Sequence, residues 1–150
     1  MSTTTRTIDR PPDAVFDVLS HGWNYSQWVV GASRIRDVSE SWPEVGSEIH
    51  HSVGAWPLLI DDVTTVRRCE RPNLLELTVR AWPTGEGIVR ITCEPDGDGT
   101  LVTMEEDATR GIAALVPKPI RDLALDLRNR EALDRLALLV ERAGQSPYAR

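Results

Sequence analysis

Hydrophobic and polar residues alternate through the middle of the chain in short segments rich in β-branched residues. Turn residues separate these segments, among them Trp-Pro and Gly-Asp pairs. Alternation over a few residues between such breaks is typical of half-buried β-strands. The predicted strands cover residues 3–9, 34–38, 48–53, 58–69, 74–81, 87–94 and 100–108.

A helical spacing of apolar residues replaces this alternation towards both ends of the chain. Residues 10–22 are predicted to form a helix, because Pro12 suits its first turn and Gly22 its end. A second, short helical segment is predicted around Trp28. The longest helix is predicted from about Pro119 to Ala143, where the following glycine ends it.

The apolar stripe of this longest helix changes phase in its middle. Its first part consists of Ile120, Leu123 and Leu127, and its second part of Leu133, Leu136 and Val140. A bend in the helix and a polar position that faces a cavity would each produce a slip at residues 129–131. Both explanations stay open at the level of the sequence.

The connections between the last six predicted strands are too short for parallel crossovers. We therefore expect these strands to form an antiparallel meander, in which alternate turns lie at the same end of the sheet. The turns at residues 54–57 and 81–85, which contain Trp56 and Trp82, are expected to share one end.

Two histidines and two aspartates flank the first of these turns. If residues 55–57 form the bend, His51 lies opposite Asp61 and His50 lies opposite Asp62. A change of one residue in the loop would break this pairing.

Apolar neighbours indicate which of these side chains face the interior. Val53 shares a strand face with His51, and Val63 shares one with Asp61, so these faces are predicted to point inward. On the last strand Met104 and Glu106 are expected on the same inner face. Three ionisable groups are therefore predicted to converge on the interior: His51, Asp61 and Glu106. His50 and Asp62 are predicted to face solvent.

Several chemistries fit these groups. His51 and Asp61 could remove a proton next to a carbonyl group, with the carboxylate orienting the imidazole, or they could hydrogen-bond a ligand or each other. Glu106 could anchor a ligand, act as an acid, or form a salt bridge with Arg128 or Arg130, which we favour. No metal site is predicted, because half of the adjacent His and Asp residues face the wrong way.

Composition narrows the class of protein. The 150 residues are 41% hydrophobic and 27% charged, which is typical of one soluble domain. The net charge of −6 argues against nucleic acid as a partner, because its phosphates attract basic surfaces. No apolar run is long enough to span a bilayer. The first ten residues lack the hydrophobic core of a secretory signal, so we expect a cytoplasmic location. Cys69 and Cys93 are predicted to be reduced thiols. No nucleotide-binding motif occurs, and no cofactor is predicted.

The order of these elements, together with three segments, resembles the START-like (SRPBCC) superfamily, which includes polyketide cyclases and dehydrases and lipid-transport proteins. The segments are RPPDAVFDVLSHGWNYSQW at residues 10–28, Gly46 before the third strand, and GDGTLVTMEED at residues 97–107. The resemblance covers residues 3–143 within one domain, 1–150. It implies an α+β helix-grip fold, in which a curved antiparallel sheet of about seven strands wraps around the long C-terminal helix.

The resemblance also implies a hollow between the long helix and the sheet that holds a small, largely apolar molecule such as a polyketide, a lipid or an isoprenoid-like compound. Two rivals remain: a polyketide cyclase or dehydratase that uses His51, Asp61 and Glu106 as acid and base, and a protein-interaction module. The oligomeric state is left open. The expected ligand contacts are Trp28, His51, Val53, Trp56, Asp61, Val63, Trp82, Met104, Glu106, Leu123 and Leu127, with Trp56 and Trp82 over the mouth.

Overall fold

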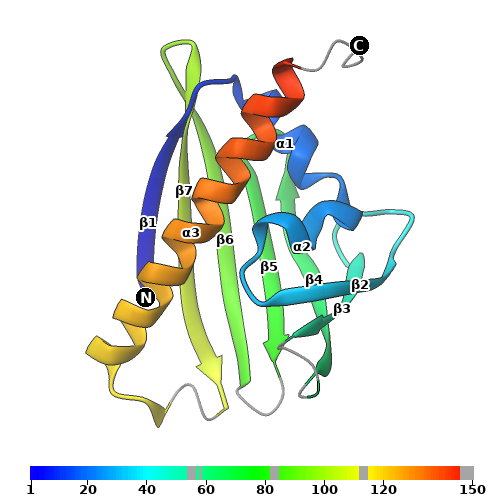
Figure 1. The fold of residues 1–150 in the computed structure, drawn as a ribbon, viewed down its shortest axis with the longest axis vertical. Helices are drawn as coiled ribbons and strands as arrows, with labels where there is room; N and C mark the ends of the chain where they lie inside the picture. Colours follow the sequence, from blue (N-terminus) through cyan, green and yellow to red (C-terminus); the bar gives the residue numbers. More distant parts are fainter. Residues whose placement is uncertain (54–56, 58, 82–84, 112–114, 146–150) are drawn as a thin grey trace.

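The computed structural model describes residues 1–53, 57, 59–81, 85–111 and 115–145, which form a seven-stranded antiparallel sheet and its covering helices (Figure 1). The strands lie in the order β1-β7-β6-β5-β4-β3-β2, so the predicted meander is confirmed and β1 pairs with β7. Their bounds are β1 Ser2–Ile8, β2 Ala32–Val38, β3 Glu48–Val53, β4 Ile60–Glu70, β5 Leu74–Ala81, β6 Gly85–Asp96 and β7 Gly99–Arg110.

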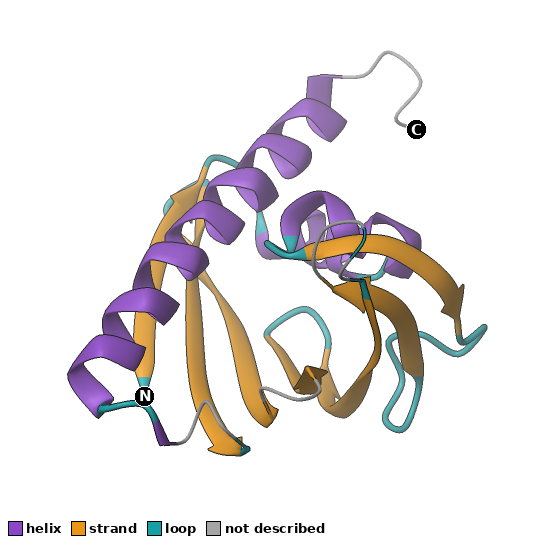
Figure 2. Ribbon diagram, turned by 60° about the horizontal axis from the view of Figure 1, so that its bottom comes forward, coloured by secondary structure: helices purple, strands orange, loops and turns teal. Residues whose placement is uncertain are grey.

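The helices lie on one side of this sheet. The long helix α3 (Lys118–Gln145) crosses it diagonally and packs against β1, and Figure 2 shows the sheet curving around this side. The short helices α1 (Pro12–Leu19) and α2 (Tyr25–Trp28), joined by the 3-10 turn η1 (Gly22–Asn24), also contact α3. This arrangement is the α+β helix-grip fold expected from the sequence.

Alternating burial along the strands defines the inner face of the sheet. On β7, Val102, Met104 and Glu106 are buried while the residues between them are partly exposed. Side chains of successive strand residues point to opposite faces, so these three face the helices. The prediction that Met104 and Glu106 point inward is confirmed.

The hydrophobic core lies under the C-terminal half of α3. Leu133, Leu136 and Val140 of the helix are fully buried there, and Phe16 of α1 and Ile8 of β1 belong to the same cluster. Full burial of each such side chain contributes about 1.5–3 kcal/mol relative to exposure, which fixes this half of the helix on the sheet.

The N-terminal half of α3 presents its apolar residues to solvent instead. Leu123 and Leu127 are both 61% exposed, so the prediction that they form part of a cavity wall is wrong. The physical reason is the helical period: Leu136 follows Leu127 by nine residues, or about two and a half turns, and these two leucines therefore lie on opposite sides of the helix.

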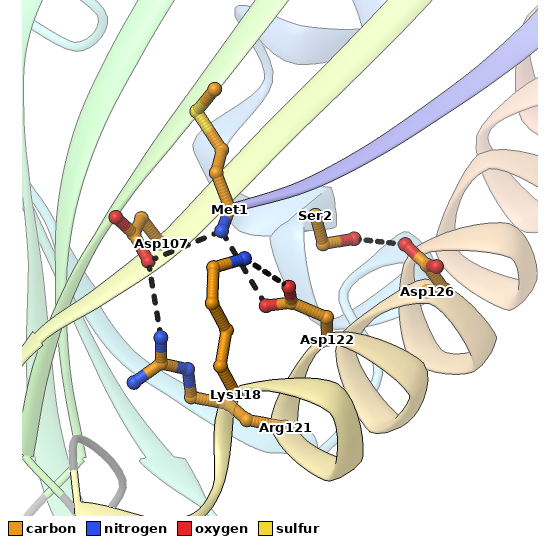
Figure 3. Close-up of polar contacts among 7 residues, drawn as sticks. All are labelled: Met1, Ser2, Asp107, Lys118, Arg121, Asp122 and Asp126. Carbon is orange, nitrogen blue, oxygen red and sulfur yellow. Dashed lines mark hydrogen bonds and ion pairs between the residues drawn. The ribbon is translucent and has the colours of Figure 1, made fainter.

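Polar contacts hold this N-terminal half of the helix near β1 and β7 (Figure 3). Asp122 accepts a hydrogen bond from Lys118 at 2.5 Å and lies 3.4 Å from the α-amino group of Met1. That amino group is also 3.6 Å from Asp107 of β7. These contacts are polar and lie at the surface. They position the start of the helix without packing an apolar layer beneath it. The residues drawn are Met1, Ser2, Asp107, Lys118, Arg121, Asp122 and Asp126.

Candidate functional site

A hollow of about 110 Å³ lies between α2, α3 and the inner face of the sheet. Most of its wall is apolar. Five residues predicted from the sequence line it: Trp28, His51, Val53, Met104 and Glu106. The described residues of the wall are Tyr25, Trp28, Val29, Val30, Gly31, Ala32, His51, Val53, Leu77, Val79, Arg80, Val89, Met104, Glu106, Arg128, Asn129 and Ala132.

The register of β3 against β4 differs by one residue from the prediction. His51 pairs with Asp62, and Asp61 pairs with Ser52. A shift of one residue moves every side chain of a strand to the other face. Asp62 is therefore buried on the inner face, which corrects the prediction that it faces solvent.

Asp61 and Val63 consequently lie on the outer face and do not line the hollow. The Asp61 side chain is 69% exposed, accepts a hydrogen bond from the Ser52 hydroxyl at 3.0 Å and lies 3.5 Å from the Arg36 guanidinium. Val63 pairs with His50. The predicted His51–Asp61 pair is wrong, and with it the idea that Asp61 orients the imidazole.

A buried chain of hydrogen bonds reaches His51 instead. The Thr64 hydroxyl lies 3.0 Å from His51 Nε2 and 3.0 Å from the Tyr25 hydroxyl. Thr64 is on the inner face of β4, and Tyr25 begins α2. The Tyr25 ring packs 5.4 Å from the His51 ring and, edge to face, 5.4 Å from Trp28. This arrangement fixes the imidazole at the wall of the hollow.

Sequence reasoning missed both Tyr25 and Thr64. Thr64 enters the inner face only in the observed register, and a threonine in a strand carries no other signal. Tyr25 could have been found, because it precedes Trp28 by three residues and three-residue spacing places two side chains on one face of a helical turn.

Burial keeps the ionisable members of this chain uncharged. It lowers the pKa of His51 to about 4, and the positive charge of Arg36 adds to this effect. Burial likewise raises the pKa of Tyr25 to about 12. Among the described residues, no hydrogen-bond partner reaches His51 Nδ1, although that atom is buried.

The wall that α3 supplies combines an ion pair with an amide. Arg128 donates a hydrogen bond to the buried carboxylate of Glu106, so the predicted salt bridge is confirmed. Asn129 is only 1% exposed, and its Nδ2 has no hydrogen-bond partner in the described part of the chain. The phase slip of the helix is therefore explained by a polar position that faces a cavity.

The two arginines among the described wall residues each have a carboxylate partner. Arg128 pairs with Glu106, and Arg80 Nε lies 3.7 Å from Glu86. A compensated cation attracts a ligand anion less than a bare one does. In the described part of the chain, the hollow thus combines an apolar wall, two residues with a buried nitrogen that has no partner, and paired charges.

Other predictions can be placed more briefly. Trp56 and Trp82, the expected cover of the mouth, lie outside the described residues. Within the described ranges, no group of three His, Cys, Asp or Glu side chains could hold a metal ion. No helix in that same part of the chain has both the length and the apolar character needed to cross a bilayer.

Comparison with solved structures finds the same fold in proteins of low sequence identity. A conserved protein from Geobacillus kaustophilus has 13% identity and a TM-score of 0.75, with 94% of this chain and 95% of that chain covered. A Chromobacterium violaceum protein has 18% identity and a TM-score of 0.68, with 93% and 96% covered. The di-domain ARO/CYC StfQ from the steffimycin biosynthetic pathway has 10% identity and a TM-score of 0.74, with 96% and 51% covered.

Sequence comparison gives the family. Comparison with curated proteins finds no match. A family model described as polyketide cyclase / dehydrase and lipid transport matches residues 2–141, which is nearly the whole chain. The resemblance inferred from the order of elements is thereby confirmed, and the chain belongs to the polyketide cyclase / dehydrase and lipid transport family.

Proposed function

We propose that the protein binds a small, largely apolar molecule in the hollow between α3 and the sheet. The observation that carries this proposal is the wall itself, in which mostly apolar side chains accompany two residues with a buried nitrogen that lacks a partner among the described residues. Pockets for small molecules commonly have this composition, in which the apolar surface supplies affinity and the polar atoms fix orientation. The family description supports a polyketide, a lipid or an isoprenoid-like compound as the occupant.

The hollow also separates this proposal from a protein-interaction module. Such a module would be expected to have a filled interior and an apolar groove on its surface, whereas here the space lies between the layers of the fold.

A cyclase or dehydratase is the second candidate. It is favoured by the uncharged imidazole at the wall and by the likeness in fold to an ARO/CYC protein. Two observations weigh against it. Asp61, the carboxylate expected to orient His51, points to solvent, and a base with a pKa of about 4 removes protons from carbon poorly at neutral pH. Binding without turnover is therefore the better-supported function.

Titration with the uncharged apolar fluorophore N-phenyl-1-naphthylamine tests the location of binding. Val53 lines the hollow, so Val53→Trp should fill part of it and weaken probe binding by about tenfold or more. Leu123→Trp adds the same ring on the exposed side of α3 and should bind as the wild type does. Equal binding by the two variants, with intact thermal unfolding, would contradict the proposal.

Two further measurements would identify the occupant and distinguish a binding protein from a cyclase or dehydratase. Native mass spectrometry of freshly purified protein should show a retained small molecule and give its mass. Wild type and His51→Ala should then be incubated with a model poly-β-ketone. Turnover by the wild type that His51→Ala loses, with folding intact, would establish the cyclase instead.

A further inference from the structure

The buried hydrogen-bonded series Tyr25, Thr64 and His51 contains one polar hydrogen more than its hydrogen bonds use. Two hydroxyl groups and one neutral imidazole carry three polar hydrogens, whereas the chain has two contacts. Each contact uses one hydrogen. One donor is therefore left over, and its position depends on which way the chain runs.

Counting unsatisfied groups decides that direction. If Tyr25 donates to Thr64 and Thr64 donates to His51 Nε2, the remaining proton is on His51 Nδ1, and one buried group lacks a partner. If His51 Nε2 donates instead, Nδ1 is a bare acceptor and a hydroxyl hydrogen is also unmet. Leaving a second buried polar group unsatisfied costs free energy, so the first direction is preferred.

The residue that carries the leftover donor lines the hollow, and so does a second residue whose buried nitrogen has no partner in the described part of the chain. His51 comes from β3 and is 4% exposed, and Asn129 comes from α3 and is 1% exposed. Neither His51 Nδ1 nor Asn129 Nδ2 has a partner in the described part of the chain. Both are nitrogen donors, so an occupant that satisfies them must supply acceptors.

We propose that the occupant of the hollow is an uncharged apolar molecule with carbonyl oxygen, and that Thr64 is a positioning residue that holds His51 as an Nδ1–H donor towards that oxygen. The inference rests on the proposed function, because it names the chemistry of the molecule bound there. The occupant is uncharged in this proposal because Arg128 and Arg80 of the wall already have carboxylate partners. Asn129 supplies the second donor from the opposite side.

A pair of probes of nearly equal shape tests the oxygen. 2-Acetylnaphthalene has a ketone where 2-ethylnaphthalene has only hydrogens, and the ketone should bind about tenfold more tightly to the wild type. Equal affinity for the two would overturn the inference and leave the proposed function standing. Failure of both probes to bind, or binding unchanged in Val53→Trp, would count against the proposed function itself and so against the inference that rests on it.

The proton position can be read directly from the wild-type protein. Two-bond ¹H–¹⁵N spectra should show the proton of His51 on Nδ1 at neutral pH, and a proton on Nε2 would overturn the assignment. Thr64→Val removes the hydroxyl at almost constant shape and should move the proton towards Nε2 while it weakens ketone binding severalfold. Thr64→Ser restores the hydroxyl and should restore both, which a merely structural role of the threonine would not require.

Discussion

The two halves of α3 use the same residue type in opposite ways. In the C-terminal half, Leu133 and Leu136 are fully buried against the sheet. In the N-terminal half, Leu123 and Leu127 face solvent, and the positions turned towards β1 include Asp122, whose contacts are polar. The C-terminal half of the helix is therefore packed on the sheet by apolar contacts, whereas the N-terminal half is held near it by polar contacts.

This difference accounts for the hollow. Apolar side chains on the inner side of the first half would have packed on the sheet and filled the space. Arg128 and Asn129, at the junction of the two halves, line it instead. The change of face along the helix thus divides the molecule into a packed region under the C-terminal half of α3 and an open region that contains the hollow. Substitutions in the two regions should change the free energy of unfolding by different amounts.

Truncation of a leucine should separate the two halves most clearly. Leu136→Ala removes a fully buried side chain and is expected to lower the free energy of unfolding by about 2–5 kcal/mol. Leu127→Ala removes the same atoms from the exposed stripe and should change it by less than about 0.5 kcal/mol. Urea unfolding of both variants measures this contrast, and equal losses would show that the stripe is covered in solution.

Acid is expected to lower the free energy of unfolding by protonating His51 in the open region. Its pKa is about 4 in the folded protein and 6.5 in the unfolded chain, so the unfolded chain binds the proton more readily between these values. Stability is therefore expected to fall as the pH drops from 6.5 to 4, by up to about 3 kcal/mol.

Urea unfolding across this pH range should show a smaller loss for His51→Gln than for the wild type. The exposed His21 provides the control, because His21→Gln should leave the loss in place. A pH profile of His51→Gln that superimposes on that of the wild type would mean that the imidazole is not buried in solution.

The smallest effect is expected from the polar contacts at the start of α3. Asp122→Asn weakens the contacts with Lys118 and the α-amino group of Met1, so the first turns of the helix should exchange their amide hydrogens faster. The difference should shrink at high salt, because surface charges are screened. Glu131→Gln breaks the pair with Arg135, 2.8 Å apart within α3, and should not affect those first turns.

The sequence was sufficient for the architecture, because the relevant signals are local. Alternation with a period of two, short turns and the helical stripe predict the strands, the antiparallel meander and α3. The inward positions of Met104 and Glu106 followed from the same alternation, and a salt bridge of Glu106 with Arg128 or Arg130 was favoured, of which the structure shows Arg128. Each of these conclusions tolerates an error of a residue or two in the bounds of an element.

The site tolerates no such error. A shift of one residue in the β3–β4 register exchanged Asp61 for Asp62 and Val63 for Thr64 on the inner face. Leu123 was misplaced because periodicity shows that a helix has an apolar face without showing which neighbour covers it. The phase slip at Asn129 did carry the information, but only the sheet shows which side of the helix is the inner one.

The first strand depends on the far end of the chain. β1 has β7 as its only strand neighbour in the described sheet, with Ser2 opposite Glu106, and its inner side meets α3. Joining segments so distant in sequence carries a large loop-closure entropy, which slows folding. During synthesis, β2 to β6 can pair as each emerges, whereas β1 must wait until β7 has left the ribosome. A nascent chain that stalls before β7 would leave its opening strand unpaired.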